Sequence, residues 1–124
     1  MADPNFFILY VDSPIASAEF YSGVLGRPPV ESAATFAMFA LDSGVMLGLW
    51  SKHTVEPSAA AVGGGTEVAF SVENDAAVDA LYKTWSTRGL TILQQPVNLD
   101  FGYTFVALDP DCHRLRVFAP SVAQ

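Results

Sequence analysis

The stretch "ALDPDCHRLRVF", residues 107–118, decides the fold because it matches an earlier stretch of the same chain. Residues 40–50 read "ALDSGVMLGLW", and the two align when the later copy carries one extra residue. The alignment places Gly48 over Arg116 and Trp50 over Phe118. In each copy, turn-forming residues precede an alternating run that is typical of a β-strand. The repeat therefore predicts two copies of one supersecondary unit.

The residues around the first copy predict a strand, a helix and three strands. Residues 5–11 form a strongly apolar run. Ser13 followed by Pro14 predicts a helix start, and Gly26 predicts the helix end. Three further strands are expected at 30–33, 35–41 and 45–50.

The second half repeats this order. Either Asn74 or Asp75 is expected to cap its helix, and Gly89 is expected to end it. Strands are expected at 67–72, 90–93, 102–108 and 114–118, with a loop through Pro96 after the second of them.

The chain therefore predicts an α+β fold of tandem βαβββ units, with the two sheets face to face and the helices outside. The first unit is expected at 1–51 and the second at 67–124, within one compact domain. The segment 52–66 contains three consecutive glycines and predicts a flexible, exposed connection.

Composition excludes several classes of partner. The chain has 124 residues, 51% of them hydrophobic, and a formal net charge of −7. Because it has no basic stripe, we expect no nucleic-acid partner and no anionic membrane partner. No apolar run approaches the roughly 20 residues that span a bilayer. A cytoplasmic protein is the expectation, and its single cysteine, Cys112, cannot form an internal disulfide.

Three stretches carry a resemblance to a known family: "LYVDSPIASAEFYSGVLG" at 9–26, "EVAFSV" at 67–72, and the stretch at 107–118. With these the chain resembles the vicinal oxygen chelate superfamily, which includes glyoxalases, extradiol dioxygenases and bleomycin-binding proteins. The resemblance implies a glyoxalase-like fold with curved mixed sheets and outer helices.

The resemblance also implies where metal ligands would lie: at Phe6, Gly48, Glu67 and Arg116. A catalytic divalent ion needs about three ligands from His, Glu, Asp or Cys, and only Glu67 qualifies. His53, in the connection, and His113, at a turn, are expected to be exposed. We therefore expect no metal, no other cofactor and no catalytic residues.

Arg116 at a former ligand position needs another explanation. The first and last strands of a unit are neighbours in this fold, so we expect a cross-strand ion pair between Arg116 and Glu67. Two alternatives stay open. Arg116 offers its guanidinium to a ligand carboxylate, or both side chains lean toward solvent.

Aromatic side chains supply the rest of the expected site. Trp50 ends a strand on the expected cavity face, where it stacks on a ligand or packs within the chain. Gly48 makes room beside it. The other expected ligand-binding residues are Phe6, Tyr10, Phe101, Tyr103 and Phe105 as walls and Ser51, Glu67 and Arg116 as polar anchors.

Within the superfamily, "LWS" at 49–51 and "FGYTF" at 101–105 make the chain similar to the binding proteins of phenazine-antibiotic resistance. That likeness implies a C2 homodimer that sequesters a planar aromatic small molecule in clefts between chains. The alternative is a metal-dependent lyase, isomerase or dioxygenase of the same superfamily. A third possibility is an interaction domain with a vestigial cavity.

Overall fold

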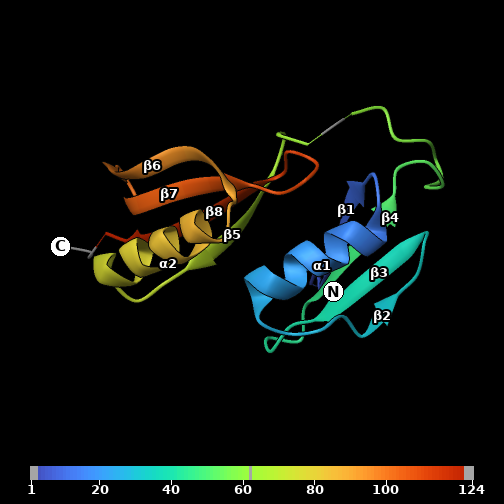
Figure 1. Ribbon diagram of the computed structural model, residues 1–124, viewed down its shortest axis with the longest axis horizontal. Coiled ribbons are helices and arrows are strands. Elements are labelled where there is room, and N and C mark those ends of the chain that lie inside the picture. Colours follow the sequence, from blue (N-terminus) through green and yellow to red (C-terminus); the bar gives the residue numbers. More distant parts are fainter. Residues whose placement is uncertain (1–2, 62, 122–124) are drawn as a thin grey trace. The chain divides into compact units, whose positions relative to one another are not determined.

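The computed structural model describes residues 3–61 and 63–121, which form two compact units that divide between residues 62 and 63. Each unit has the order strand, helix and three strands (Figure 1). The predicted α+β fold of tandem βαβββ units is therefore confirmed. The division between the units falls inside the segment that was expected to connect them.

The first unit consists of β1 (Phe6–Val11), α1 (Pro14–Leu25), β2 (Glu31–Ser32), β3 (Phe36–Ala40) and β4 (Met46–Ser51). Its sheet has the order β1-β4-β3-β2, so the first and last strands are neighbours. They run parallel, whereas the other pairs are antiparallel. A parallel pair cannot be joined by a tight turn, and the chain between β1 and β4 supplies the long connection.

Both predicted ends of α1 are confirmed. The Ser13 hydroxyl accepts a hydrogen bond from the backbone N–H of Ala16 at 3.2 Å, which satisfies one unpaired donor of the first turn. Gly26 adopts a left-handed φ of 67° and donates its N–H to the Ser22 carbonyl. The helix contributes Tyr21, which is fully buried like Phe39 of β3 in the same unit. Burial of both apolar side chains stabilises the unit.

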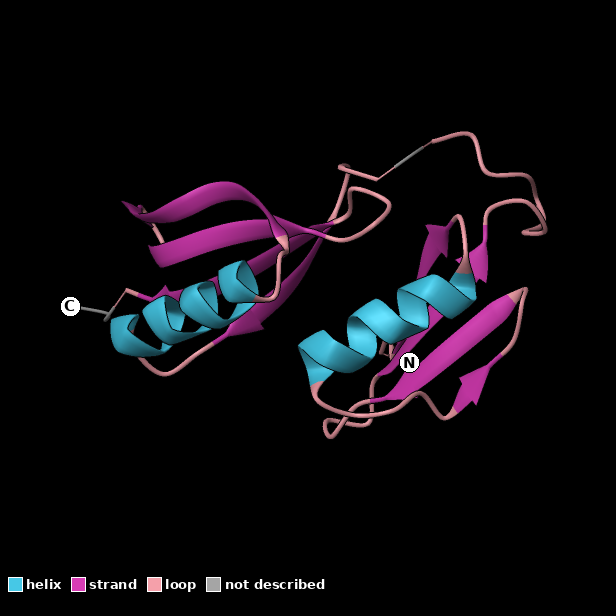
Figure 2. Ribbon diagram, in the orientation of Figure 1, coloured by secondary structure: helices cyan, strands magenta, loops and turns pink. Residues whose placement is uncertain are grey.

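The second unit consists of β5 (Glu67–Ser71), α2 (Asp75–Thr87), β6 (Thr91–Leu99), β7 (Gly102–Leu108) and β8 (Arg114–Pro120). Its sheet has the order β5-β8-β7-β6, which repeats the arrangement of the first unit. Figure 2 shows the same pairing of one helix with one sheet in each unit.

The strand registers support the residue-by-residue alignment of the two halves. Phe6 lies opposite Met46 in the parallel pair of the first unit. Glu67 lies opposite Arg114 in the second, at the equivalent place. The strands of the repeat therefore agree in register as well as in order, and Gly48 and Arg116 occupy equivalent positions.

Of the two predicted caps, Asn74 is the one that α2 uses, because its side chain accepts from the Ala77 N–H at 2.9 Å. The Trp85 ring, 2% exposed, meets the Phe70 and Phe105 rings edge-on at centroid distances of 5.7 and 5.4 Å. These rings form the core between α2 and its sheet. Neither α2 nor any other helix of residues 3–61 and 63–121 is long and apolar enough to cross a bilayer.

The prediction for the strand before β7 is wrong in extent. A strand at 90–93 and a loop through Pro96 were expected, but β6 continues to Leu99. β6 is an edge strand, and its register with β7 shifts between Gln94 and Val97. Proline is tolerated at such a place because an edge strand can lose one backbone donor.

The segment after β4 also differs from expectation, because it is not exposed throughout. Val55 is 4% exposed, and its backbone N–H donates to the Ser51 carbonyl at 3.0 Å. An apolar side chain of the predicted connection is therefore buried.

Gly102 gives a test of the second unit. It begins β7 with a φ of 148°, and a Cβ there would collide with the carbonyl oxygen of Ala119 in β8. We expect Gly102→Ala to lower the free energy of unfolding by about 3 kcal/mol, because it adds backbone strain and a steric clash. Urea unfolding followed by circular dichroism measures the loss.

Gly65→Ala is the matched control, since no atom lies within 4 Å of a Cβ at that position. Its effect should stay within about 0.5 kcal/mol. Equal unfolding midpoints for the two variants would contradict the assigned role of Gly102.

Candidate functional site

The Arg116 guanidinium and the Glu67 carboxylate form the predicted ion pair. Nε donates to Oε1 at 2.7 Å and Nη2 donates to Oε2 at 2.9 Å, so the pair is bidentate. Arg116 lies opposite Ala69 in the parallel pair of β5 and β8, and its side chain reaches two residues back along β5. Two parallel charge-assisted bonds fix the orientation of both groups.

Two further contacts hold the same guanidinium. Nη1 donates to the Thr104 hydroxyl oxygen at 3.2 Å, and that hydroxyl donates to the Val117 carbonyl at 2.8 Å. The Phe101 ring lies 5.5 Å from the guanidinium carbon, at cation–π distance. Arg116 is therefore oriented by an acid, a hydroxyl and an aromatic ring.

Sequence reasoning missed Thr104, because alternation counted from Phe101 placed it on the face opposite to the expected site. Side chains alternate along β7, so Thr104 must face away from Tyr103 and Phe105. It lies opposite Phe118 in the antiparallel pair of β7 and β8, two residues from Arg116. A fully buried hydroxyl needs hydrogen-bond partners, and the Val117 carbonyl and Arg116 supply them.

The ion pair changes the titration of both of its members. The hydrogen bonds from Arg116 lower the pKa of the Glu67 carboxyl, and the charge of Arg114 contributes a smaller part. The hydrogen bonds to Glu67 raise the pKa of Arg116. The side chains are 16% and 32% exposed for Arg116 and Glu67, so water screens the attraction only in part.

Phe101 stands on the face of Arg116, outside the regular strand. It lies in the turn before β7, is 44% exposed, and meets the Phe118 ring edge-on at 5.8 Å. The positive φ of Gly102 interrupts the strand alternation between Phe101 and Tyr103. The turn therefore places Phe101 on the face opposite to the next two aromatic side chains of the stretch.

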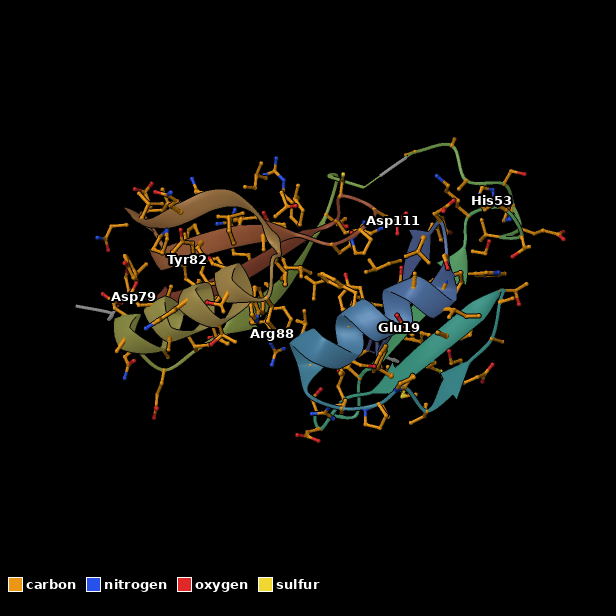
Figure 3. The ribbon with its side chains drawn as sticks, in the orientation of Figure 1. Glu19, His53, Asp79, Tyr82, Arg88 and Asp111 are labelled. Atoms are coloured by element: carbon orange, nitrogen blue, oxygen red, sulfur yellow. The ribbon has the colours of Figure 1, made fainter. Side chains whose placement is uncertain are left out.

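The expectation that Tyr103 and Phe105 wall the same site as Arg116 is not supported. The Tyr103 hydroxyl donates to Asp79 of α2 at 2.7 Å, and the Phe105 ring contacts Tyr82 and Trp85 of that helix at 5.4 Å. Figure 3 labels Asp79 and Tyr82 on α2. Both residues therefore belong to the helix-covered face, and we remove them from the candidate site.

The first unit presents an aromatic sheet face of its own. Phe6 and Tyr10, which alternate along β1, are each 42% exposed, and Ile8 between them is 43% exposed. A Cβ at Gly48 would lie 2.9 Å from atoms of the Phe6 and Phe36 rings. The space beside Trp50 that Gly48 was predicted to leave is therefore occupied by two rings of the same unit.

Trp50 lies half-buried on this face. It is opposite Tyr10 in β1 and Phe36 in β3, and it meets the Phe36 ring edge-on at a centroid distance of 6.3 Å. Ser51 is different, because it is 4% exposed and its hydroxyl accepts from the His53 backbone at 3.2 Å. We therefore keep Trp50 as a candidate and remove Ser51 as a polar anchor.

The residues at the positions implied for metal ligands do not suit a divalent ion. Phe6 and Gly48 offer no donor atom, and both carboxylate oxygens of Glu67 bind Arg116. Within residues 3–61 and 63–121, no three His, Cys, Asp or Glu side chains gather closely enough to hold one.

Neither histidine adds a ligand to these positions. His53 is exposed, as expected, and lies 2.7 Å from Asp12, which lowers the pKa of that carboxyl. The expectation for His113 is wrong, since it is 9% exposed. The Asp109 carboxylate accepts from the backbone N–H groups of His113 and Asp111, and these bonds fix the conformation of the turn.

Comparison with known proteins places this fold and these motifs in context. A model of the glyoxalase/bleomycin resistance protein/dioxygenase superfamily matches residues 4–117. The phenazine antibiotic resistance protein EhpR of Enterobacter agglomerans is 26% identical over 117 residues, which cover 92% of this chain and 89% of that protein.

Solved structures show the same fold. The solution structure of protein ATC0852 from Agrobacterium tumefaciens is 56% identical, with a TM-score of 0.91 and coverage of 98% of this chain and 100% of that chain. A glyoxalase-related enzyme from Fulvimarina pelagi is 20% identical, with a TM-score of 0.83 and coverage of 100% and 99%.

Removing one member of the ion pair gives a test. We expect Glu67→Ala to lower the free energy of unfolding near neutral pH by about 1–2 kcal/mol, because it leaves a partly buried guanidinium without its counterion. Urea unfolding measures this loss of stability. Asp42→Ala is the matched control, since it breaks the pair of Arg27 with a carboxylate that is 92% exposed, and should cost much less.

The pH dependence gives a second readout of the same variant. Because the pKa of Glu67 is lower in the folded protein than in the unfolded chain, the ionised carboxylate stabilises the fold at pH values above the ordinary pKa of a glutamate. This stabilisation is lost as the pH falls through the pKa of the folded state. The difference between wild type and Glu67→Ala should therefore shrink below about pH 4. A constant difference across that range would contradict the ion pair as its cause.

Proposed function

Because the chain belongs to the glyoxalase/bleomycin resistance protein/dioxygenase superfamily, we propose that it binds a planar aromatic small molecule without a metal. Its role is sequestration of an antibiotic-like compound. The name of the Enterobacter agglomerans relative, a phenazine antibiotic resistance protein, supports this class of ligand. The enzymatic alternative has no comparable support from the donor atoms at the implied ligand positions.

The aromatic face of the first unit carries the proposal. Trp50 and Tyr10 lie opposite each other there, and Phe6 covers Gly48 where a metal ligand was implied. Such a face attracts a flat conjugated ring by apolar burial and offset stacking, and stacking adds about 0.5–1.5 kcal/mol. A ligand of roughly 20 heavy atoms gains about 6 kcal/mol, which corresponds to dissociation in the tens of micromolar.

The second unit supplies polar contacts in this proposal. Arg116 and Glu67 form an ion pair, and the exposed ring of Phe101 lies 5.5 Å from the guanidinium carbon. A small number of fixed polar groups beside apolar surface is typical of ligand sites. We assign to them the orientation of the ligand.

Ligand titration tests the aromatic contact. Phenazine derivatives should quench the fluorescence of Trp50, and Trp50→Phe should abolish the quenching and weaken binding about tenfold through the lost stacking. Trp85, which is 2% exposed, serves as an internal reference in both proteins. A non-planar compound of similar size is the matched ligand control. Quenching that persists in Trp50→Phe, or none with any flat polycycle, would reject the proposal.

A C2 homodimer is the second part of the proposal. First-half strands of one chain and second-half strands of the other would build each of two equivalent clefts. β1 carries exposed apolar side chains, and Phe7 among them is 53% exposed. Association of two chains typically covers such a surface. Light scattering after size exclusion should give about twice the 13.3 kDa of one chain. A monomer at tens of micromolar would refute the dimer.

A further inference from the structure

We infer that Glu67 is a specificity-determining residue, which makes the site favour an uncharged aromatic ligand over the same ligand with a carboxylate. The inference rests on the proposed function. Glu67 achieves this by acting as an internal counterion that occupies Arg116. The open question of whether Arg116 meets Glu67 or a ligand carboxylate is thereby answered in favour of Glu67.

Glu67 binds the edge of the Arg116 guanidinium that Nε and Nη2 form. Nε and Nη2 project two parallel N–H groups, and a carboxylate matches this edge with both oxygens. Glu67 takes both positions, at 2.7 and 2.9 Å. A ligand carboxylate therefore finds the best edge of Arg116 filled by a group of its own kind.

Two further contacts prevent Arg116 from turning another edge toward a ligand. The Thr104 hydroxyl binds Nη1 from one side, and Phe101 lies over the guanidinium. Thr104 is itself held by the Val117 carbonyl and is fully buried. Rotation of Arg116 would break the Thr104 bond as well as the ion pair.

A ligand carboxylate has two remaining routes to Arg116, and both are costly. In the first it displaces Glu67, which leaves that partly buried carboxylate without its partner. In the second it approaches Arg116 beside Glu67 and meets a like charge. An uncharged ligand meets neither cost. The net charge of −7 on the chain adds to the repulsion of an anion.

Arg114 is a second cation that acts on the pair. It lies opposite Glu67 in the register of β5 and β8, and its charge contributes to the electrostatics of that carboxylate. A gain in carboxylate binding could therefore arise through Arg114, and only a variant that also removes Arg116 separates the two routes.

The experiment compares phenazine-1-carboxamide with phenazine-1-carboxylate, two flat ligands of nearly equal shape that differ in charge. Binding to the full-length protein is measured by calorimetry at neutral pH. Wild type should bind the carboxamide more tightly. Glu67→Gln keeps the size of the side chain and removes its charge, so it should shift the affinity ratio toward the carboxylate by about tenfold or more.

Glu73→Gln is the matched control, because Glu73 is an exposed residue of the same unit and the charge change is identical. It should shift the ratio by less than about twofold, as expected for a screened distant charge. In Glu67→Gln/Arg116→Gln the shift should disappear. Unfolding curves establish that each variant is folded at the temperature of the measurement.

The outcomes separate this inference from the function on which it rests. If neither ligand binds wild type, the proposed function fails and the inference with it. If the carboxamide binds but wild type prefers the carboxylate, or Glu67→Gln behaves like Glu73→Gln, the inference alone fails. A shift that survives the loss of Arg116 assigns the selectivity to Arg114 and also overturns it.

Discussion

In both units the first strand runs parallel to the last, and this pairing determines which distant residues meet. It places position 6 beside β4 and position 67 beside β8, although about 40 to 50 residues of sequence separate the partners. The βαβββ order makes the pairing possible, because the helix and two strands provide the length of the connection. Everything proposed for the site depends on this register, since a slip by one residue would reverse the faces of the side chains.

The two units carry side chains of opposite chemistry at equivalent positions of their first and last strands. In the first, Phe6 lies over Gly48, and the contact is apolar. In the second, Glu67 binds Arg116 through two hydrogen bonds. Each solution is self-consistent, because a ring needs a neighbour without a side chain and a partly buried cation needs an acid. A duplicated unit has thus kept its backbone plan while its two copies acquired different surfaces.

The sequence predicted the elements well where local chemistry decides them. The caps at Ser13, Gly26 and Asn74 follow from backbone hydrogen bonding within one turn, and the ion pair follows from the order of the strands. Sequence reasoning failed where one residue alters the periodicity. Gly102 reverses the relation between Phe101 and the strand that follows, so strict alternation put Tyr103 and Phe105 on the wrong face. His113 was misjudged because a turn position suggests exposure, whereas the residue is buried and its backbone N–H is bound by the Asp109 carboxylate.

The close fit of two rings around Gly48 has an evolutionary consequence. Any side chain at this position would begin 2.9 Å from both Phe6 and Phe36, so a histidine or glutamate could enter only if both rings moved or changed. A metal ligand at this position would therefore require coordinated substitutions, and the single changes on the way would be unfavourable. Such epistasis makes the glycine at position 48 difficult to replace while both rings are present.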